Sequence, residues 1–158
     1  MKTLFPKQEH HIPKWYVIDA TSKTLGRLAT EVSKLLRGKE KSYFTPGINQ
    51  GNFVIILNAQ KIQVSGKKRS DKFYYRNSTR PGGLKKETFD QLQKRIPSRI
   101  IEQAVWGCYQ KGVLGRSYYR RLYIYSQNYV PSFSTEEKKK KIIPLDLGSS
   151  QNWIKMEI

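Results

Sequence analysis

The sequence predicts an α/β protein with three layers, α/β/α, in which helices flank a mainly parallel sheet of about four strands. Short β-branched and aromatic runs alternate with segments of helical periodicity, which is the pattern of parallel strands joined by crossover helices. The run FVIILNA at residues 53–59 is almost continuously apolar, as expected of a strand covered on both faces. The chain of 158 residues, 37% of them hydrophobic, is long enough for one domain with polar tails.

Three regions follow from this pattern. Residues 1–14 are polar, contain two prolines and are expected to form an extended N-terminal arm. Residues 15–127 hold all the alternating segments and are expected to form the α/β domain. Residues 128–158 are expected to form a C-terminal extension, which includes a run of four lysines at 138–141.

The first half of the domain begins with WYVIDA at 15–20, a short run typical of a buried strand. An amphipathic helix follows, with Ser22 or Thr24 as its cap and Gly38 as its end. Its apolar face is formed by Leu25, Leu28, Ala29, Val32, Leu35 and Leu36. The segment 42–52 contains proline and two glycines and predicts a loop before the strand at 53–59.

The second half is less regular. Residues 61–66 alternate weakly and turn at Gly66, DKFYYR at 71–76 is a further strand candidate, and NSTRPGGLKK is expected to be a basic loop. Short helices are predicted at 87–95 and at 98–109, the second capped by Ser98 with Pro97 just before it. Residues 111–121 form a basic segment broken by glycines, and LYIYS at 122–126 is the last predicted strand.

Charge is the strongest functional signal. Thirty basic residues oppose 12 acidic ones, which gives a formal net charge of +18. Such an excess repels itself unless a polyanion neutralises it, and the usual polyanions are nucleic acid and an anionic membrane surface. Residues 60–99 carry a large share of this excess, so the charge is concentrated and predicts a binding surface.

Two stretches combine this charge with aromatic residues and glycines. Lys and Arg neutralise phosphates, aromatic rings stack on unpaired bases, and glycines allow a close approach of the backbone. We therefore expect nucleic-acid contacts from residues 66–86 and 111–121, which supply Lys67, Lys68, Arg69, Lys72, Tyr74, Tyr75, Arg76, Arg80, Lys85, Lys86, Lys111, Gly112, Gly115, Arg116, Tyr118, Tyr119, Arg120 and Arg121. For any single tyrosine, packing in the core is the favoured alternative.

Patterns for catalysis are absent from the sequence. His10 and His11 lie on the arm, where we expect solvated side chains, and no Cys or His spacing predicts a metal site. Cys108 is the one cysteine, so no internal disulfide is possible, and a buried or half-buried side chain is expected. Asp19 ends a strand and is interpreted as a helix cap or a partner of an arginine. No phosphate-binding loop, secretory signal or apolar run of membrane-spanning length occurs, so we expect no enzyme activity, no cofactor, no small-molecule substrate and no membrane partner.

The order of motifs resembles one family. The segments that carry the resemblance cover roughly residues 14–127 and are WYVIDATSKTLGRLATEVSKLLRGK, YFTPGINQGNFVIILNAQKIQVSGKK, KFYYRNSTRPGGLK, AVWGCYQKGVLGR and RLYIYS. They are similar to the bacterial-type large-subunit ribosomal protein thirteen family. The resemblance implies a three-layer α/β/α fold and a structural role without enzymatic activity, with large-subunit ribosomal RNA and neighbouring large-subunit proteins as partners from early in assembly.

The resemblance also implies RNA contacts at matching positions. These are Arg27, Arg37, Lys39, Lys67, Lys68, Lys85, Lys111, Gly115 and Arg116, with Tyr74 and Tyr75 at a family position that leaves stacking or packing open. We add Lys41 to this expected surface. The chain departs from the family pattern at 45–49, 107–110 and 128–131, and it runs past the usual end from about Gly148. Its many Lys, Ile, Tyr and Asn residues favour an organelle ribosome, a plastid before a mitochondrion, with a bacterial source as the alternative.

Three other functions compete with this hypothesis. A basic RNA-processing enzyme would need a general acid and base or a cofactor pocket. A DNA-binding regulator would prefer duplex DNA over structured RNA. A membrane-surface protein would need an apolar helix face that the core does not use.

Overall fold

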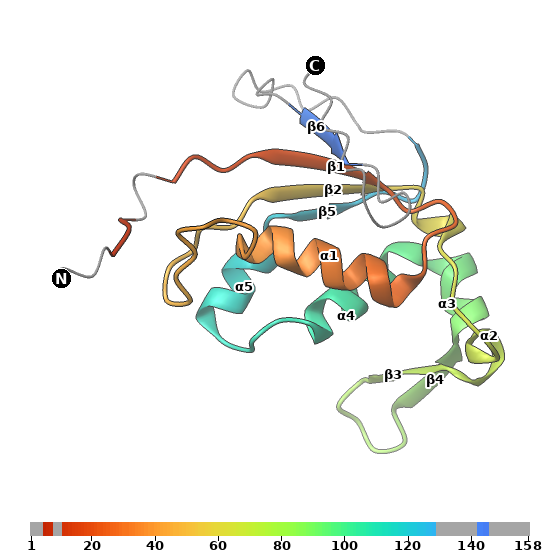
Figure 1. The fold of residues 1–158 in the computed structure, drawn as a ribbon. Helices are drawn as coiled ribbons and strands as arrows, with labels where there is room; N and C mark the ends of the chain where they lie inside the picture. Colours follow the sequence, from red (N-terminus) through yellow and green to blue (C-terminus); the bar gives the residue numbers. More distant parts are fainter. Residues whose placement is uncertain (1–4, 8–10, 129–141, 146–158) are drawn as a thin grey trace, which may run out of the picture.

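The computed structural model describes residues 5–7 and 11–128, together with the backbone of 142–145. Its centre is a parallel four-stranded sheet in the order β5-β2-β1-β6 (Figure 1). The strands are β1 (Trp15–Asp19), β2 (Phe53–Leu57), β5 (Leu122–Ile124) and β6 (Ile142–Leu145). The predicted α/β class and the parallel sheet of about four strands are confirmed.

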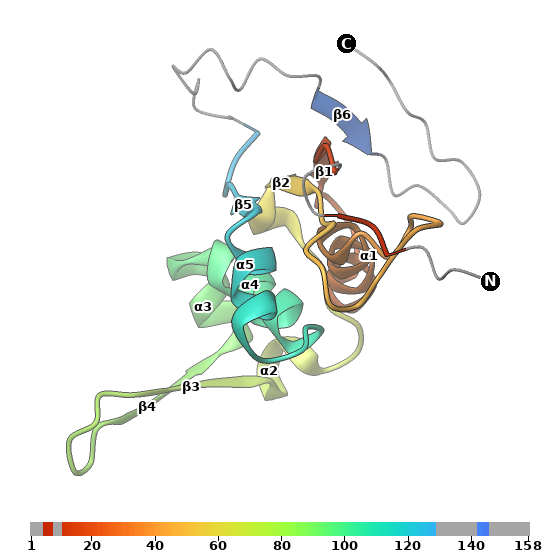
Figure 2. The same cartoon turned by 90° about the vertical axis from the view of Figure 1, so that its left-hand side faces the viewer.

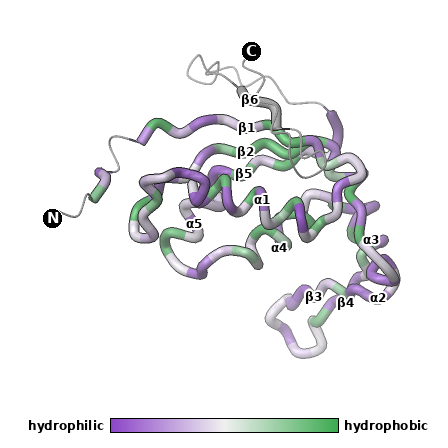
Figure 3. The backbone as a smooth tube through the Cα atoms, in the orientation of Figure 1, coloured by the Kyte–Doolittle hydropathy of each residue, from purple (hydrophilic) through white to green (hydrophobic). Residues whose placement is uncertain are grey.

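The sheet forms because its strands are rich in β-branched and aromatic side chains that suit a pleated, covered surface. Central strand β2 reads FVIIL, with its three middle residues buried, and Figure 3 shows it as a hydrophobic segment. Its neighbour β1 alternates, with Tyr16 and Ile18 buried. Tyr16 lies opposite Val54 and Ile18 opposite Ile56, so the buried residues share one face.

Helices α1 (Leu25–Arg37), α4 (Pro97–Gly107) and α5 (Val113–Tyr119) lie on that face of the sheet (Figures 1 and 2). The predicted apolar stripe of α1 is buried as expected. Thr24 occupies the N-cap without a side-chain hydrogen bond, and the helix ends at Gly38, whose φ of 73° is the left-handed conformation that favours glycine. The resulting core joins sheet and helices into one hydrophobic cluster.

The opposite face of the sheet carries an aromatic stack. The Trp15 ring lies 4.3 Å from the Phe53 ring and 5.8 Å from the Tyr123 ring, measured between centroids. We expected helices on both faces, but the helices of residues 11–128 pack on the face of Tyr16 and Ile56. Partly buried aromatic rings and the buried Ile55 therefore lie on the second face of this sheet.

A second, two-stranded sheet projects from the helical side (Figure 2). Strand β3 (Phe73–Asn77) pairs antiparallel with β4 (Leu84–Thr88), and the short helix α2 (Lys68–Asp71) precedes them. The strand expected within 71–76 thus exists, but in a separate hairpin. The expected basic loop at 77–86 is partly wrong, since its last three residues begin β4.

Helix α3 (Phe89–Arg95) fixes the base of this hairpin. Thr88 ends β4 and caps α3 through a capping box with Gln91, and Phe89 is fully buried. Strand and helix are therefore consecutive, and the hairpin is held to the core at its base.

Several sequence predictions need correction. Pro97 is the first residue of α4, not the residue before it, because its missing N–H suits a helix start. Residues 113–119 of the glycine-broken segment form α5. Residues 61–66 contain the end of the 3₁₀ helix η2 (Ala59–Lys61) and a single bridge from Gln63 to Thr24. Ile142–Leu145, in the expected C-terminal extension, pairs with β1, whereas the lysine run at 138–141 and the tail from 148 lie outside the described residues.

Candidate nucleic-acid interface

The basic side chains expected at the interface come from four places in the fold. The hairpin unit of α2, β3 and β4 supplies Lys67, Lys68, Arg69, Arg76, Arg80, Lys85 and Lys86. The end of α1 and the turn after it supply the exposed Lys39 and the half-buried Arg37 and Lys41. The α5 region supplies the exposed Lys111, Arg116 and Arg120 and the half-buried Arg121. Arg27 is exposed on the first turn of α1. The structure therefore shows a distributed basic surface in which the hairpin unit is the densest part.

The hairpin unit leaves most of its charge exposed. Lys67 and Lys68 lie at the start of α2 without an ion pair among the described residues. Arg69 is different, because its Nε lies 3.0 Å from Asp90 Oδ1 in an exposed ion pair. Such an exposed pair contributes little stability and is easily exchanged for a phosphate. The three side chains can thus all reach an anionic ligand.

The tip of the hairpin is shaped by its turn residues. Residues 78–83 connect the strands, with the Ser78 N–H donating to the Gly83 carbonyl oxygen at 3.2 Å. Gly82 has a φ of 71°, which suits glycine. This turn places Arg80 at the exposed end of the hairpin.

The tyrosine pair divides between two roles. Tyr74 is half-buried and packs against the hydrophobic core, and its hydroxyl is buried without a hydrogen-bond partner among the described residues. Burial raises its pKa. Tyr75 points to the other side of β3 and is 59% exposed. Tyr74 is therefore a packing residue, whereas the exposed ring of Tyr75 can contact a ligand.

Lys41 is half-buried, and its ammonium group is bonded to the protein itself. Its Nζ donates to the Gln50 carbonyl oxygen at 2.8 Å and to Asn52 Oδ1 at 3.1 Å. Burial lowers the pKa of Lys41 to about 8. The negative charge of Glu40 raises this pKa, whereas the positive charges of Arg121 and Lys14 lower it. These contacts order the loop at 42–52 and leave Lys41 poorly placed for a phosphate.

His11 completes this polar cluster. Its Nε2 lies 2.9 Å from the Gly51 carbonyl oxygen, and its Nδ1 lies 3.2 Å from Lys41 Nζ. A neutral ring with its proton on Nε2 satisfies both contacts. The expectation of a solvated arm histidine is therefore wrong for His11, while His10 lies outside the described residues.

Arg121 approaches the same loop from the other end of the chain. Its guanidinium donates to the Gly51 carbonyl oxygen and lies 5.3 Å from the centroid of the Phe53 ring. Burial lowers its pKa. Gly51 is required here because a Cβ would lie 1.8 Å from the Leu36 carbonyl oxygen. The sequence predicts Arg121 as an RNA contact, but in the structure its side chain stabilises the loop around Gly51.

The α5 region mixes exposed cations with packing residues. Arg116 and Arg120 are exposed. Lys111 Nζ donates to the Trp106 carbonyl oxygen at 2.7 Å and lies 4.5 Å from the centroid of the Trp106 ring. Gly115 is buried, and a Cβ there would lie 2.1 Å from the Gln110 carbonyl oxygen. Gly115 therefore has a structural role, because the absence of a side chain lets its backbone pack closely against the backbone of Gln110.

Tyr118 and Tyr119 also pack rather than protrude. Tyr118 is buried beside Tyr109, with ring centroids 6.1 Å apart, and the Tyr119 ring meets Trp106 edge to face at 5.4 Å. Burial raises the pKa of both hydroxyls. The aromatic residues of this segment therefore anchor α5 to the core.

No catalytic arrangement is formed by the described residues. They contain no group of three His, Cys, Asp or Glu side chains that could hold a metal, and no helix among them is long and apolar enough to cross a membrane. Burial would raise the pKa of Asp19, but hydrogen bonds from Asn58 and Thr21 outweigh it and lower the pKa. Asp19 thus orders the turn after β1. The interpretation of Asp19 as a helix cap or an arginine partner is wrong, because Thr24 is the N-cap of α1 and the hydrogen bonds of Asp19 come from Thr21 and Asn58. Cys108 is exposed, contrary to expectation.

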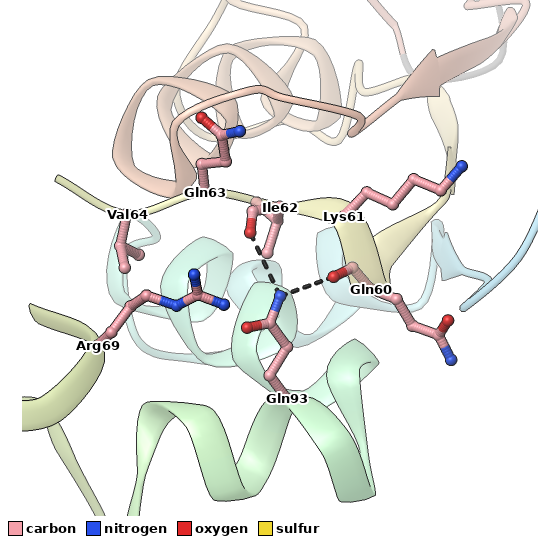
Figure 4. A pocket seen from close by; sticks show the side chains of 7 residues that line it. All are labelled: Gln60, Lys61, Ile62, Gln63, Val64, Arg69 and Gln93. Atoms are coloured by element: carbon pink, nitrogen blue, oxygen red, sulfur yellow. Dashed lines mark hydrogen bonds between the residues drawn. The ribbon is translucent and has the colours of Figure 1, made fainter.

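A pocket of about 390 Å³ lies between the segment after β2 and helix α3 (Figure 4). Gln93 Nε2 links helix α3 to the other wall of the pocket, because it donates hydrogen bonds to the Gln60 and Ile62 carbonyl oxygens at 2.6 and 3.3 Å. Arg69 and Lys61 add positive charge at its rim. The pocket holds no carboxylate or histidine, so it offers no acid–base pair for catalysis.

Sequence patterns did not indicate the cluster around Gly51 or the exposed ring of Phe73. The cluster joins residues 11, 41, 51 and 121, and no local spacing connects them. Alternation along residues 73–77 would have assigned Phe73 and Tyr75 to one side of the strand. That signal was present, although the pairing partner of the strand was not identified.

Comparisons with known proteins agree on one family. A family model described as ribosomal protein L13 matches residues 13–131. The large ribosomal subunit protein uL13 of Thermosynechococcus vestitus is 54% identical over 126 residues, which are 80% of this chain and 83% of that protein. The protein uL13 of Cyanothece sp. is 47% identical over 144 residues, or 91% of this chain and 95% of that protein. The protein uL13c of Spinacia oleracea is 48% identical over 158 residues, and the match spans 98% of this chain and 60% of the spinach protein.

Proposed function

The chain belongs to the ribosomal protein L13 family, and from this premise we propose that it is a structural component of the large ribosomal subunit that binds and stabilises folded large-subunit ribosomal RNA, beginning early in assembly. The members of this family are structural proteins of the ribosome, and the family is not a class of enzymes. The relatives are named as proteins of the large ribosomal subunit, and RNA binding from early in assembly goes beyond those names.

The observation that carries RNA binding is the exposed basic hairpin unit. Eight Lys or Arg residues stand against one acid between residues 66 and 86, and every one of these eight is exposed. Neutralising phosphates releases counterions and gives a favourable term that falls with salt. The unit projects from the helical body (Figure 2), so it can enter a groove or crevice of a folded RNA.

The proposed partners are large-subunit ribosomal RNA and neighbouring large-subunit proteins. Further RNA contacts are proposed at the matching positions Arg27, Arg37, Lys39, Lys111 and Arg116. Similarity to cyanobacterial proteins and to the spinach protein uL13c supports a plastid ribosome, with the ribosome of a bacterial cytoplasm as the alternative.

The salt dependence of binding tests this function. Wild-type protein and the variant Lys67→Ala/Lys68→Ala/Arg69→Ala are titrated against large-subunit ribosomal RNA at several salt concentrations. The variant is expected to bind more weakly at low salt, with a slope of log affinity against log salt that is smaller by about 2 to 3. Its melting temperature should stay close to wild type because these side chains are exposed.

Duplex DNA of matched length serves as the competitor. Preference for structured RNA supports the proposal, whereas preference for the DNA would support a DNA-binding regulator. An unchanged affinity and slope for the triple variant would mean that the hairpin unit is only a solvated surface.

A further inference from the structure

The β3–β4 hairpin has two chemically different faces. Residues directly opposite one another in an antiparallel pair lie on the same side, and sides alternate along each strand. The register pairs Tyr75 with Lys86, Phe73 with Thr88 and Asn77 with Leu84. One side therefore carries Phe73, Tyr75, Leu84 and Lys86, and the other carries Tyr74, Arg76, Lys85 and Glu87.

The second of these sides turns toward the protein at the base of the hairpin. Tyr74 packs against the core, and Glu87 Oε2 forms an ion pair with Arg95 Nη2 of helix α3 at 2.6 Å. The first side consequently faces away from the body. It exposes three large apolar residues, Phe73 at 39%, Tyr75 at 59% and Leu84 at 63% of their surfaces.

A cluster of exposed apolar side chains in a strongly charged segment indicates an interaction site. Single exposed hydrophobic residues are ordinary, but Phe73, Tyr75 and Leu84 expose a strip of three large apolar residues on one side of the hairpin. The surrounding charge selects the partner. Lys86 lies on the same side as the strip and Arg80 lies in the turn, while Lys72, Arg76 and Lys85 carry positive charge on the other side of the hairpin. Asp71 is the one acidic residue between residues 66 and 86.

The partner must therefore offer flat apolar surface and negative charge together. Unpaired nucleotides offer both, because each base has an exposed π face and each carries a phosphate. Paired bases in an RNA duplex hide their faces within the helix and present grooves and phosphates instead. The strip thus fits single-stranded or bulged RNA better than a duplex.

The geometry of the strip points to Tyr75 as the main platform. Lys86 Nζ already lies 3.7 Å from the centroid of the Phe73 ring. Tyr75 makes no ring stacking or cation contact with the described residues, and its ring is the more exposed of the two. Positions two apart on a strand are about 7 Å apart, roughly twice the rise between stacked bases, so one base can be accommodated between the two rings.

We propose that the outward side of the hairpin, with Tyr75 as platform and Phe73 beside it, stacks on unpaired nucleobases of the bound RNA. This inference rests on the proposed RNA-binding function and adds to it the kind of RNA that the hairpin selects. Lys86, directly opposite Tyr75, lies where it can neutralise the phosphate of a stacked nucleotide.

Two variants at one position separate stacking from other contacts. Tyr75→Leu removes the π face but keeps apolar bulk, and Tyr75→Phe keeps the ring. Lys85→Gln, on the opposite side of the hairpin, is the charge control. Each full-length protein is titrated by fluorescence anisotropy against a single-stranded RNA of about 12 nucleotides and against the duplex of the same sequence.

Tyr75→Leu is expected to bind the single strand about tenfold more weakly and the duplex with nearly unchanged affinity. Its salt slope should match wild type because stacking releases no counterions. Tyr75→Phe should behave as wild type, and Lys85→Gln should weaken both RNAs with a smaller slope. An unchanged melting temperature of Tyr75→Leu confirms that the fold is intact.

Several results would overturn the inference. If Tyr75→Leu binds the single strand as wild type does, stacking is wrong while RNA binding stands. If this variant keeps its RNA affinity but loses a crosslink from the hairpin to a large-subunit protein, the strip is a protein-binding surface. If wild-type protein shows no salt-dependent affinity for either RNA, the proposed function itself fails and the stacking with it.

Discussion

The Lys41 ammonium donates a hydrogen bond to the Gln50 carbonyl oxygen at 2.8 Å. Sequence pattern placed Lys41 among the RNA contacts, but this bond turns its charge toward the protein backbone. Lys39, two residues earlier, is exposed. The two lysines are therefore expected to serve different purposes although they share one turn.

Lys41→Met should destabilise the protein by about 1 to 2 kcal/mol, because the Gln50 carbonyl and Asn52 side chain lose a donor. Lys39→Met should leave stability unchanged and weaken RNA binding. Urea unfolding and RNA titration of both variants measure this division. Equal stability of the two variants would contradict the structural role of Lys41.

His11 predicts a pH-dependent stability. Burial lowers the pKa of His11, and the positive charges of Lys41 and Arg121 lower it as well. The hydrogen bond to Gly51 raises the pKa, but the net result is a pKa below the ordinary value of 6.5. The unfolded chain then binds more protons than the folded chain below about pH 7, and stability falls as the pH drops through this range.

Unfolding free energies of wild type and His11→Gln, measured at about pH 7.5 and about pH 5, test this prediction. Gln retains a donor for the Gly51 carbonyl but does not titrate. Wild type should lose more stability than the variant on acidification. An equal loss would show that other groups, such as Asp19, dominate the acid response.

Glycine-to-alanine changes should have opposite effects at two positions. Gly115→Ala places a Cβ 2.1 Å from the Gln110 carbonyl oxygen, and the forced backbone shift should cost about 1 to 3 kcal/mol. Gly26→Ala, in helix α1, meets nothing within 4 Å and should stabilise by about 0.5 to 1 kcal/mol. Thermal unfolding of both variants gives the comparison, and a neutral Gly115→Ala would return that residue to the list of RNA contacts.

Cys108 should react in the native protein. The side chain is exposed after the end of α4, so Ellman's reagent should modify it without denaturant. Cys108→Ser should leave the melting temperature unchanged. Modification only after unfolding would show that the thiol is covered.

The central sheet could be predicted because its strands carry their own signal. The run at 53–57 is apolar throughout, and α1 repeats its apolar residues at helical spacing. Strand β4 was missed because Lys85, Lys86 and Glu87 are poor strand formers by themselves, and its strand conformation depends on pairing with β3. Strand β6 contains Pro144, which argues against a strand except at the edge of a sheet, and the edge is where it lies.

The interface could be predicted only as a charged surface. Clustered charge identifies exposed lysines such as Lys67 and Lys68 correctly. It does not reveal that Lys41 and Arg121 bind the backbone near Gly51. His11 and Arg121 come to this cluster from 40 and 70 residues away in the chain, and Lys41 reaches Gln50 across a loop without regular periodicity. Nor does it separate Tyr74 from Tyr75, which requires knowing which side of β3 faces the core.

The most direct measurement of the proposed role is sedimentation of the native protein. Lysate from the native source is run through a sucrose gradient at moderate salt, and the fractions are probed for this chain. We expect it to migrate with the large ribosomal subunit and to remain there after a salt wash. A position at the top of the gradient, free of ribosomal particles, would contradict the role as a stable component of the subunit.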